Sequence, residues 1–180
     1  MDNGRIKRLA KTVLLTVVTW YTLWFGLSAL LQTANPIVFV GLDPGLSWNE
    51  CSMTPTLSPG DVLFLQGVPS DQIEVGDIIV FRNPRNPDDL IVHRVIQIVI
   101  RDGRHYFTTK GDNPRTNPWS LSYEKDFPAT YIVGRVIFKI PLVGWVWIAV
   151  KTPAGTVVLI GCIIVIAALE LKGKGTETYT

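Results

Sequence analysis

The sequence predicts a mainly β protein: a coiled antiparallel β domain with one N-terminal transmembrane helix and a second, C-terminal helix that is also expected to span the membrane. Three observations predict this class. Hydrophobic residues make up 47% and charged residues 18% of the chain, whereas average soluble proteins carry about 25% charged residues. The apolar residues gather at both ends of the chain. Between them, short runs rich in Val, Ile and Phe alternate with Gly and Pro turns, as in successive strands.

The N-terminal apolar segment has the length and the flanks of a membrane anchor. No charged residue occurs from Thr12 to Leu42, and residues 12–31 would form a helix about 30 Å long, which matches the hydrocarbon core. A cleaved secretory signal is the alternative, but the stretch is too long for one and no clean small-x-small site ends it. We therefore expect residues 12–34 to cross the membrane and residues 1–11 to be cytoplasmic, because four cations precede the span: Arg5, Lys7, Arg8 and Lys11.

A second apolar segment runs from Thr152 to Leu169 and would reach about 27 Å as a helix, just enough to span. Trp145 and Trp147, ahead of it, favour a position at the membrane interface. A buried core helix is the alternative for the apolar segment, and a final strand with a buried turn for the stretch before it. We expect an interface segment, a second transmembrane helix and a cytoplasmic tail, respectively residues 141–151, 152–170 and 171–180.

Residues 35–140 are expected to form the β domain, outside the cytoplasm and tethered at both ends. Five strands are predicted in it: Asp61–Gln66, Asp77–Arg82, Leu90–Ile100, His105–Lys110 and Ile132–Ile140. The net charge of +2 is too balanced for a protein that binds nucleic acid through bulk charge. Two cysteines, Cys51 and Cys162, provide neither a disulfide framework nor a zinc site.

Three segments of this domain carry residues suited to hydrolytic chemistry. Strand alternation puts Ile91, His93 and Val95 on one face, and a lone histidine there is more often structural than catalytic. Ser52 precedes a proline that fixes the chain, and Asp112 lies in a Gly-Asp-Asn turn. Each of these two, taken alone, is more often an ordinary loop or turn residue. Only in combination do these residues indicate a hydrolytic site.

Five short motifs follow one another in order: Ser52–Leu57 (SMTPTL), Gly76–Phe81 (GDIIVF), Ile91–Val95 (IVHRV), Lys110–Asn113 (KGDN) and Val133–Val136 (VGRV). Their order and spacing, with the anchor ahead of them, resemble the type I signal peptidases over roughly residues 50 to 145. The usual bacterial branch has a lysine base where this sequence has His93, so the chain resembles the archaeal and endoplasmic-reticulum branch, which some Gram-positive bacteria also carry. The resemblance implies a coiled β catalytic domain outside the cytoplasm that removes signal peptides from translocated preproteins.

The chemistry that this resemblance implies is acyl transfer by a serine and a histidine. Ser52 would attack the scissile carbonyl, and His93 would accept the proton and return it to the leaving amine. Asp112 would orient His93, and Asn117 would support it from about the place where the family has a second acid. The other nearby acid, Asp126, lies in a polar run and is expected at the surface. No metal or other cofactor is needed for such chemistry.

The substrate is expected to bind in extended form along an edge strand, for which Asp77–Arg82 is the candidate. Met53, Ile78 and Val80 are the expected substrate-binding residues, and the resemblance implies Ala-x-Ala before the cut. Expected partners are signal peptides of secreted preproteins, the lipid bilayer and the translocation machinery, with no nucleic acid. The expected location is the cell membrane, or the endoplasmic-reticulum membrane in a eukaryote. A catalytically silent relative and an envelope assembly module that binds without cleaving are the alternative functions.

Overall fold

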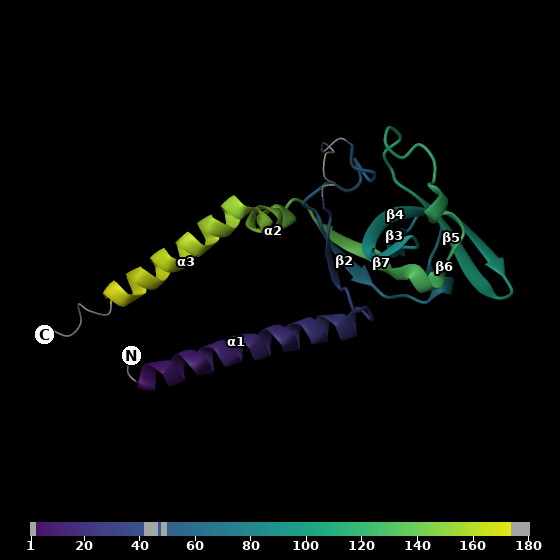
Figure 1. Ribbon diagram of the computed structural model, residues 1–180. Helices are drawn as coiled ribbons and strands as arrows, with labels where there is room; N and C mark the ends of the chain where they lie inside the picture. The colour runs from purple at the N-terminus through teal and green to yellow at the C-terminus, as the bar shows by residue number, and fades with distance from the viewer. Residues whose placement is uncertain (1–2, 42–46, 48–49, 174–180) are drawn as a thin grey trace, which may run out of the picture.

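The computed structural model describes residues 3–41, 47 and 50–173. A long N-terminal helix, α1 (Asn3–Leu30), leads into a β domain, and two C-terminal helices follow it, α2 (Gly144–Lys151) and α3 (Pro153–Gly173). Figure 1 shows α1 and α3 extending from the same end of the β domain, so that the N-terminal end of α1 and the C-terminal end of α3 both lie away from it. The predicted combination of a β domain with apolar terminal helices is confirmed.

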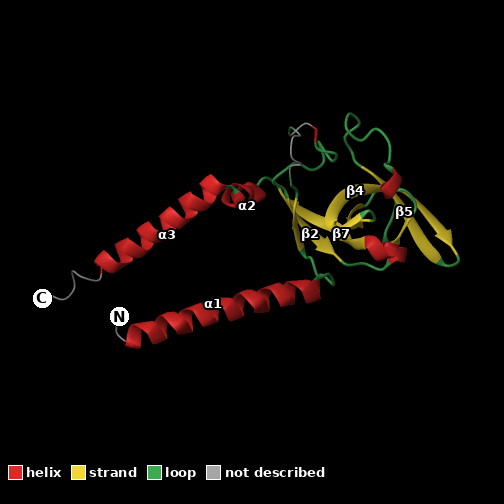
Figure 2. Ribbon diagram, in the orientation of Figure 1, coloured by secondary structure: helices red, strands yellow, loops and turns green. Residues whose placement is uncertain are grey.

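The β domain is one seven-stranded sheet in the order β1-β2-β7-β3-β4-β5-β6, in which every neighbouring pair is antiparallel. Figure 2 shows how strongly this sheet curls. Short 3-10 turns η2, η3 and η4 connect the strands at Ser70–Gln72, Ser122–Glu124 and Ala129–Tyr131. The strands are β1 (Ile37–Phe39), β2 (Val62–Gln66), β3 (Ile78–Asn83), β4 (Asn86–Arg101), β5 (Arg104–Lys110), β6 (Phe127–Pro128) and β7 (Ile132–Ile140).

The strand order corrects one expectation about substrate binding. The predicted edge strand, Asp77–Arg82, corresponds to β3, and β3 lies inside the sheet. It pairs with β4 along its whole length and with β7 through Ile79, Val80 and Phe81. Both hydrogen-bonding edges of its central residues are therefore occupied, so a peptide cannot add to this strand.

The two faces of the sheet bury separate clusters of apolar side chains. Ile79 and Phe81 of β3 point into one cluster with Val95 and Phe107, while Val80 packs into the other. This alternation is what a strand's two-residue period dictates. In β4, Ile91 and Val95 pack in one cluster and Val92 in the other, which confirms that Ile91 and Val95 share a face. The second cluster joins the strands to the loop before β2: Val40, Met53, Leu57, Leu63, Leu65 and Val80.

Helix α1 contains a segment of 21 residues, Ala10–Leu30, that is long and apolar enough to cross a membrane, and none of it is buried against the protein. Its C-terminal end is fixed to the β domain. The Gly67 N–H donates to the carbonyl of Leu31 (2.8 Å), and the Thr33 hydroxyl donates to the carbonyl of Val133 (3.0 Å). The anchor and the sheet are thus joined without a flexible spacer between them.

The second transmembrane helix, expected at residues 152–170, stays a prediction. Helix α3 is 21 residues long, and its apolar part within the described residues is the shorter segment Pro153–Cys162. Helix α2 occupies most of the predicted interface segment, residues 141–151. Val143 and Val146, at the start of this region, are 55% and 71% exposed, which is compatible with a position in the membrane interface.

Candidate active site

Ser52 and His93 lie in direct contact, although 40 residues separate them in the chain. Ser52 belongs to the loop before β2, and its hydroxyl oxygen lies 2.9 Å from Nε2 of His93. His93 lies in the middle of β4, opposite Ile79 of β3, and its ring is 6.5 Å from the ring of Phe81. The histidine is 4% exposed. A nucleophile within hydrogen-bond reach of a potential base is the central element of a serine hydrolase site.

The Ser52 loop is held by the turn that follows β5. The backbone N–H of Asn113 donates to the carbonyl of Ser52 (2.8 Å), and its side-chain amide donates to the carbonyl of Cys51 (2.9 Å). On the other side of the loop, Met53 and Leu57 are anchored in the apolar cluster. The two hydrogen bonds from Asn113 and the apolar contacts of Met53 and Leu57 therefore fix the position of the Ser52 side chain.

Lys139 supports the C-terminal part of the same loop. Its ammonium group donates to the carbonyl of Thr56 (2.7 Å) and lies 3.4 Å from the carboxylate of Asp61. Asp61 is buried and also accepts from the backbone N–H of Ser58 and of Leu142. Because its ammonium group is bound to a carbonyl and a carboxylate, Lys139 has a structural role and connects β7 to the loop.

Asn117, expected to support the histidine, instead supports the turn beside Ser52. Its side-chain oxygen accepts a hydrogen bond from the backbone N–H of Gly111 (2.6 Å), and the residue is 3% exposed. The Asn117 N–H donates in turn to the carbonyl of Asn113 (2.9 Å). Asn117 therefore stabilises the Gly111–Asn113 turn, which itself holds the Ser52 loop.

The structure does not have the expected direct contact between Asp112 and His93. Both carboxylate oxygens of Asp112 accept hydrogen bonds from the guanidinium of Arg94, at 2.8 and 2.6 Å. These bonds hold the pKa of Asp112 below its ordinary value, and hydrogen bonding from Thr56 and the nearness of His93 act in the same direction. A two-bonded Arg–carboxylate pair is strong and directional, so Asp112 ties the strand that carries His93 to the loop that carries Ser52.

The carboxylate beside the histidine is that of Glu124. Its Oε1 lies 2.5 Å from Nδ1 of His93, and its Oε2 accepts a hydrogen bond from the backbone N–H of Leu121 (2.6 Å). The residue is fully buried (0% exposed). Sequence reasoning missed Glu124 because it lies in a polar run that ends in Asp126, and that aspartate is at the surface as predicted, paired with Arg101. Charge pattern alone does not distinguish a buried member of such a run from its exposed neighbours.

The expected substrate-binding residues lie in the apolar cluster beneath the loop. Met53 is 2% exposed and Val80 is fully buried, while Ile78 is partly exposed and packs against the same cluster. Met53 is the direct chain neighbour of Ser52, so the cluster begins next to the nucleophile. Whether these side chains meet a substrate stays a prediction.

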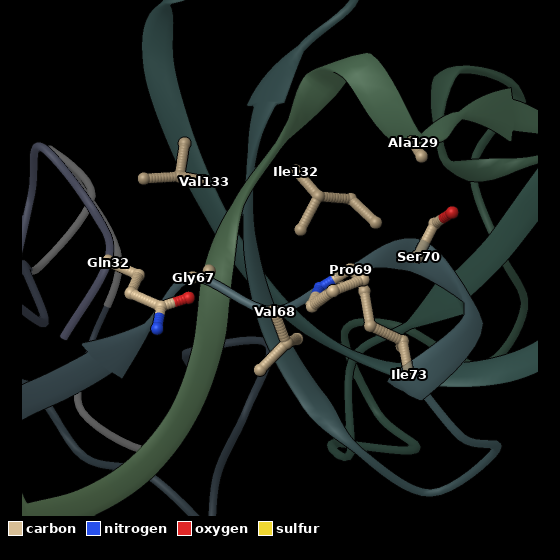
Figure 3. A pocket seen from close by; sticks show the side chains of 10 residues that line it. Gln32, Gly67, Val68, Pro69, Ser70, Ile73, Ala129, Ile132 and Val133 are labelled. Carbon is tan, nitrogen blue, oxygen red and sulfur yellow. The ribbon is translucent and has the colours of Figure 1, made fainter.

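A cavity of about 380 Å³ lies elsewhere, between the end of α1 and the loop after β2. Figure 3 shows the side chains that line it, among them Gln32, Val68, Ile73 and Ile132. None of the residues around Ser52 and His93 lines it. Within the described part of the chain, no cluster of three or more His, Cys, Asp or Glu residues has the arrangement of a metal site.

Comparison with known proteins shows the family to which this chain belongs. The model of the signal peptidase family, peptidase S26, matches residues 15–99, which include both Ser52 and His93. Signal peptidase complex catalytic subunit SEC11 of Pyricularia oryzae is 36% identical over 138 residues, which cover 74% of this chain and 74% of that protein. The chain belongs to the signal peptidase family. The family assignment made from the five motifs is thereby confirmed.

Two further relatives define how far the similarity extends. The SEC11 catalytic subunit of Colletotrichum graminicola is 36% identical over 137 residues and 74% of each chain. The human signal peptidase complex catalytic subunit SEC11C is 38% identical over 129 residues, which cover 70% of this chain. Those 129 residues are 62% of the human subunit, so the match spans less than two thirds of that protein's length. All three relatives are named catalytic subunits of the signal peptidase complex, which supports the predicted archaeal and endoplasmic-reticulum branch of the family.

Proposed function

We propose that this protein is a membrane-bound serine endopeptidase that removes signal peptides from translocated preproteins. The observation that carries the proposal is the 2.9 Å contact between the Ser52 hydroxyl and Nε2 of His93, inside a fold whose relatives are named signal peptidase catalytic subunits. A catalytically silent relative would have no need to keep a serine and a buried imidazole at this distance.

The reaction proceeds in two acyl-transfer steps. The Ser52 oxygen attacks the carbonyl at the cleavage site while Nε2 of His93 accepts its proton. The tetrahedral intermediate collapses as His93 returns that proton to the leaving amine, and the signal peptide remains joined to Ser52 as an ester. A water molecule, deprotonated by His93, then attacks the ester and releases the signal peptide as a carboxylate.

The negative charge that develops on the carbonyl oxygen needs fixed donors. The Ser52 backbone N–H is the proposed donor, because it stands next to the reacting oxygen and the Asn113 bonds to the same loop hold it in place. A side-chain hydroxyl two residues before the serine is absent, since Glu50 occupies that position. Loss of a single such donor typically costs a factor of about 10²–10³ in rate.

The substrate adds to β4 rather than to β3. Strand β3 covers one side of β4 from Asn86 to Arg94, whereas in the described part of the sheet β5 pairs with the other side only from Arg94 onward. The half of β4 that leads to His93 therefore has one unpaired edge. An extended peptide bonded to this edge would pass its scissile carbonyl close to Ser52, as in other strand-addition complexes.

Substrate side chains then alternate between the enzyme and solvent, so the residues at −1 and −3 face the protein together. Their proposed surroundings are apolar and close to Met53, which favours small residues such as Ala-x-Ala. Equal rates for a preprotein with bulky residues at both positions and for one with Ala-x-Ala would contradict this specificity.

The membrane-bound state and its orientation complete the proposal. Helix α1 supplies an anchor of the required length, and its four leading cations favour a cytoplasmic N-terminus. The β domain then lies on the extracytoplasmic side, where translocated preproteins emerge. Lipid, signal peptides and other subunits of a secretion complex are its proposed partners, the last because the relatives are named subunits of a signal peptidase complex.

A cleavage assay with the purified full-length chain tests this function. The wild type in detergent micelles is expected to cut a radiolabelled preprotein at its signal-peptide junction, and Ser52→Ala is expected to leave it uncut. If both proteins bind and crosslink to signal peptides but neither cuts, the protein is a silent relative. If neither cuts nor crosslinks, the assembly-module alternative is favoured.

A further inference from the structure

We propose that Glu124 is the positioning residue of His93 and fixes the proton of the imidazole on Nδ1. The inference rests on the proposed Ser52–His93 chemistry and assigns its acidic partner to a residue outside the five motifs. Glu124 reaches the histidine from η3, 31 positions further along the chain, and its Oε1 lies 2.5 Å from Nδ1. The opposite ring nitrogen, Nε2, faces Ser52. The three side chains thus form one continuous line.

Glu124 and His93 are both buried, so neither side chain can rely on water for its polar contacts. Glu124 is 0% exposed and His93 is 4% exposed, and a carboxylate removed from water needs compensating donors. Among the described residues, neither Oε1 of Glu124 nor Nδ1 of His93 makes a hydrogen bond, so the 2.5 Å ion-pair contact between them is the polar contact that each atom has. The two atoms are therefore left to each other, and a carboxylate facing Nδ1 favours the tautomer with the proton on that nitrogen.

The other carboxylate oxygen fixes the direction from which Glu124 approaches. Oε2 accepts from the backbone N–H of Leu121 at 2.6 Å, and the backbone of Glu124 donates back to the carbonyl of Leu121 (3.0 Å). The Ser120 hydroxyl bonds to the carbonyl of Thr109 on β5 (2.6 Å). The carboxylate is therefore held in place by its own turn, which is tied to the sheet.

A second support comes from the hairpin between β3 and β4. The guanidinium of Arg85 bonds to the hydroxyl of Ser122 and lies over the ring of Tyr123, 5.3 Å from its centroid. Both of these residues are in η3, next to Glu124. The hairpin that leads into the histidine strand thus also holds the turn that carries the glutamate.

Asp112 is excluded from the same role by its partner. Its carboxylate is bound by Arg94 through both oxygens and by the side chain of Thr56, and it acts on His93 only as a nearby charge. The direct partner of Nδ1 is Glu124, and it is the only one of the two acids that can select a tautomer by contact.

Glu124→Gln provides a sharp test because the Leu121 N–H decides how the new amide is oriented. This N–H can only donate, so it takes the amide oxygen and leaves the NH₂ group facing Nδ1 of His93. An NH₂ donor requires a lone pair on Nδ1, which moves the imidazole proton to Nε2. Nε2 then cannot accept the proton of Ser52. The nearly isosteric substitution is therefore expected to be at least as damaging as Glu124→Ala.

The kinetic experiment compares Glu124→Gln, Glu124→Ala and the exposed control Glu74→Gln in the full-length chain, with one preprotein substrate. We expect Glu124→Gln to lower kcat by about 10⁴-fold, as loss of a triad carboxylate does elsewhere, with KM changed by less than about threefold. Glu74→Gln should match the wild type. A kcat for Glu124→Gln within tenfold of the wild type, or far above that of Glu124→Ala, would show that the residue is only structural.

A spectroscopic measurement keeps the test valid if a variant folds poorly. The chain has two histidines, so a spectrum with ¹⁵N-labelled imidazoles contains two rings, and His105→Gln assigns them. In the wild type at neutral pH, His93 is expected to carry its proton on Nδ1, and in folded Glu124→Gln on Nε2. A wild-type His93 with its proton on Nε2 would overturn the inference.

The two proposals fail in different ways. If Ser52→Ala abolishes cleavage while Glu124→Gln remains active, the peptidase function stands and the role of Glu124 is refuted. If the wild type cuts no preprotein but His93 has its proton on Nδ1 and loses it there in Glu124→Gln, the positioning geometry stands and the proposed function is refuted.

Discussion

Gly111 lies so close to Ser52 that a Cβ atom at position 111 would come within 2.4 Å of the Ser52 carbonyl oxygen. The obstacle is backbone, which cannot rotate away as the end of a side chain can. The close approach lets the turn after β5 bond to the serine loop through Asn113. The glycine of the Gly-Asp-Asn motif is therefore required by contact with the nucleophile loop, rather than by its own backbone conformation.

Gly111→Ala is expected to displace Ser52 from His93. We expect a loss of about 1–3 kcal/mol in the free energy of unfolding, as in other overpacked sites. A displacement of about 1 Å can cost about 100-fold in rate, so kcat should fall by at least that order. Cleavage assays and thermal unfolding measure both effects. Gly41→Ala, where a Cβ meets no atom within 4 Å, is the matched control, and equal behaviour of the two variants would refute the argument.

Asn117→Ala should act on stability more than on chemistry. It removes the acceptor for the Gly111 N–H and leaves a buried donor unsatisfied, which costs about 1–3 kcal/mol. We expect a smaller decrease in kcat than Glu124→Gln causes. Asn117→Asp keeps an oxygen acceptor at this position and should retain more stability than Asn117→Ala. Chemical denaturation of the wild type, Asn117→Asp and Asn117→Ala measures their stabilities. A higher stability of Asn117→Ala than of Asn117→Asp would contradict the assigned hydrogen bond.

The fold was predictable where it depends on local pattern. Alternation in β4 placed Ile91, His93 and Val95 on one face, and turn residues separated the five main strands. β1 and β6 were missed because strands of three and two residues carry no periodic signal. The position of β3 inside the sheet was missed for another reason: strand order depends on pairing with β7, about 50 residues away, which no local pattern encodes.

The site was predictable to the same extent. The motifs identified Ser52 and His93, which the structure brings together. They also suggested Asp112 as the acid, whereas the neighbouring Arg94 binds that carboxylate. The sequence pattern does not predict this competition, because strand alternation places Arg94 on the face opposite His93 without indicating which carboxylate it binds. Glu124 enters the site through a loop whose path depends on the turn at Leu121 and on the sheet beneath it.

Asp112 should make stability depend on acid pH. Its pKa is lowered in the folded protein, chiefly by hydrogen bonds from Arg94. A carboxyl whose folded pKa is lowered contributes stability that is complete above its unfolded pKa of about 3.9 and is lost as the pH falls through the folded value. Asp112→Asn should therefore unfold more readily at neutral pH and lose less stability below pH of about 4. Urea titrations between neutral and acid pH test this, and parallel curves would contradict it.

Membrane topology can be tested with tags at both ends. We expect protease added outside intact cells to digest the β domain and to spare both tags, because the cations before α1 favour a cytoplasmic N-terminus and α3 is expected to return the chain across the membrane. Detergent permeabilisation, as the control, should expose both tags. Digestion of the C-terminal tag in intact cells would show that α3 does not span.

In the proposed mechanism, His93 activates Ser52 to form an ester with the signal peptide. Mass spectrometry of acid-quenched reactions measures this most directly, because acid halts hydrolysis of the ester. The wild type should carry an adduct with the mass of the signal peptide minus one water, located on Ser52 by proteolytic mapping, and His93→Ala should carry none under the same conditions. Cleavage of the preprotein with an adduct on another residue, or undiminished adduct formation in His93→Ala, would contradict the claim.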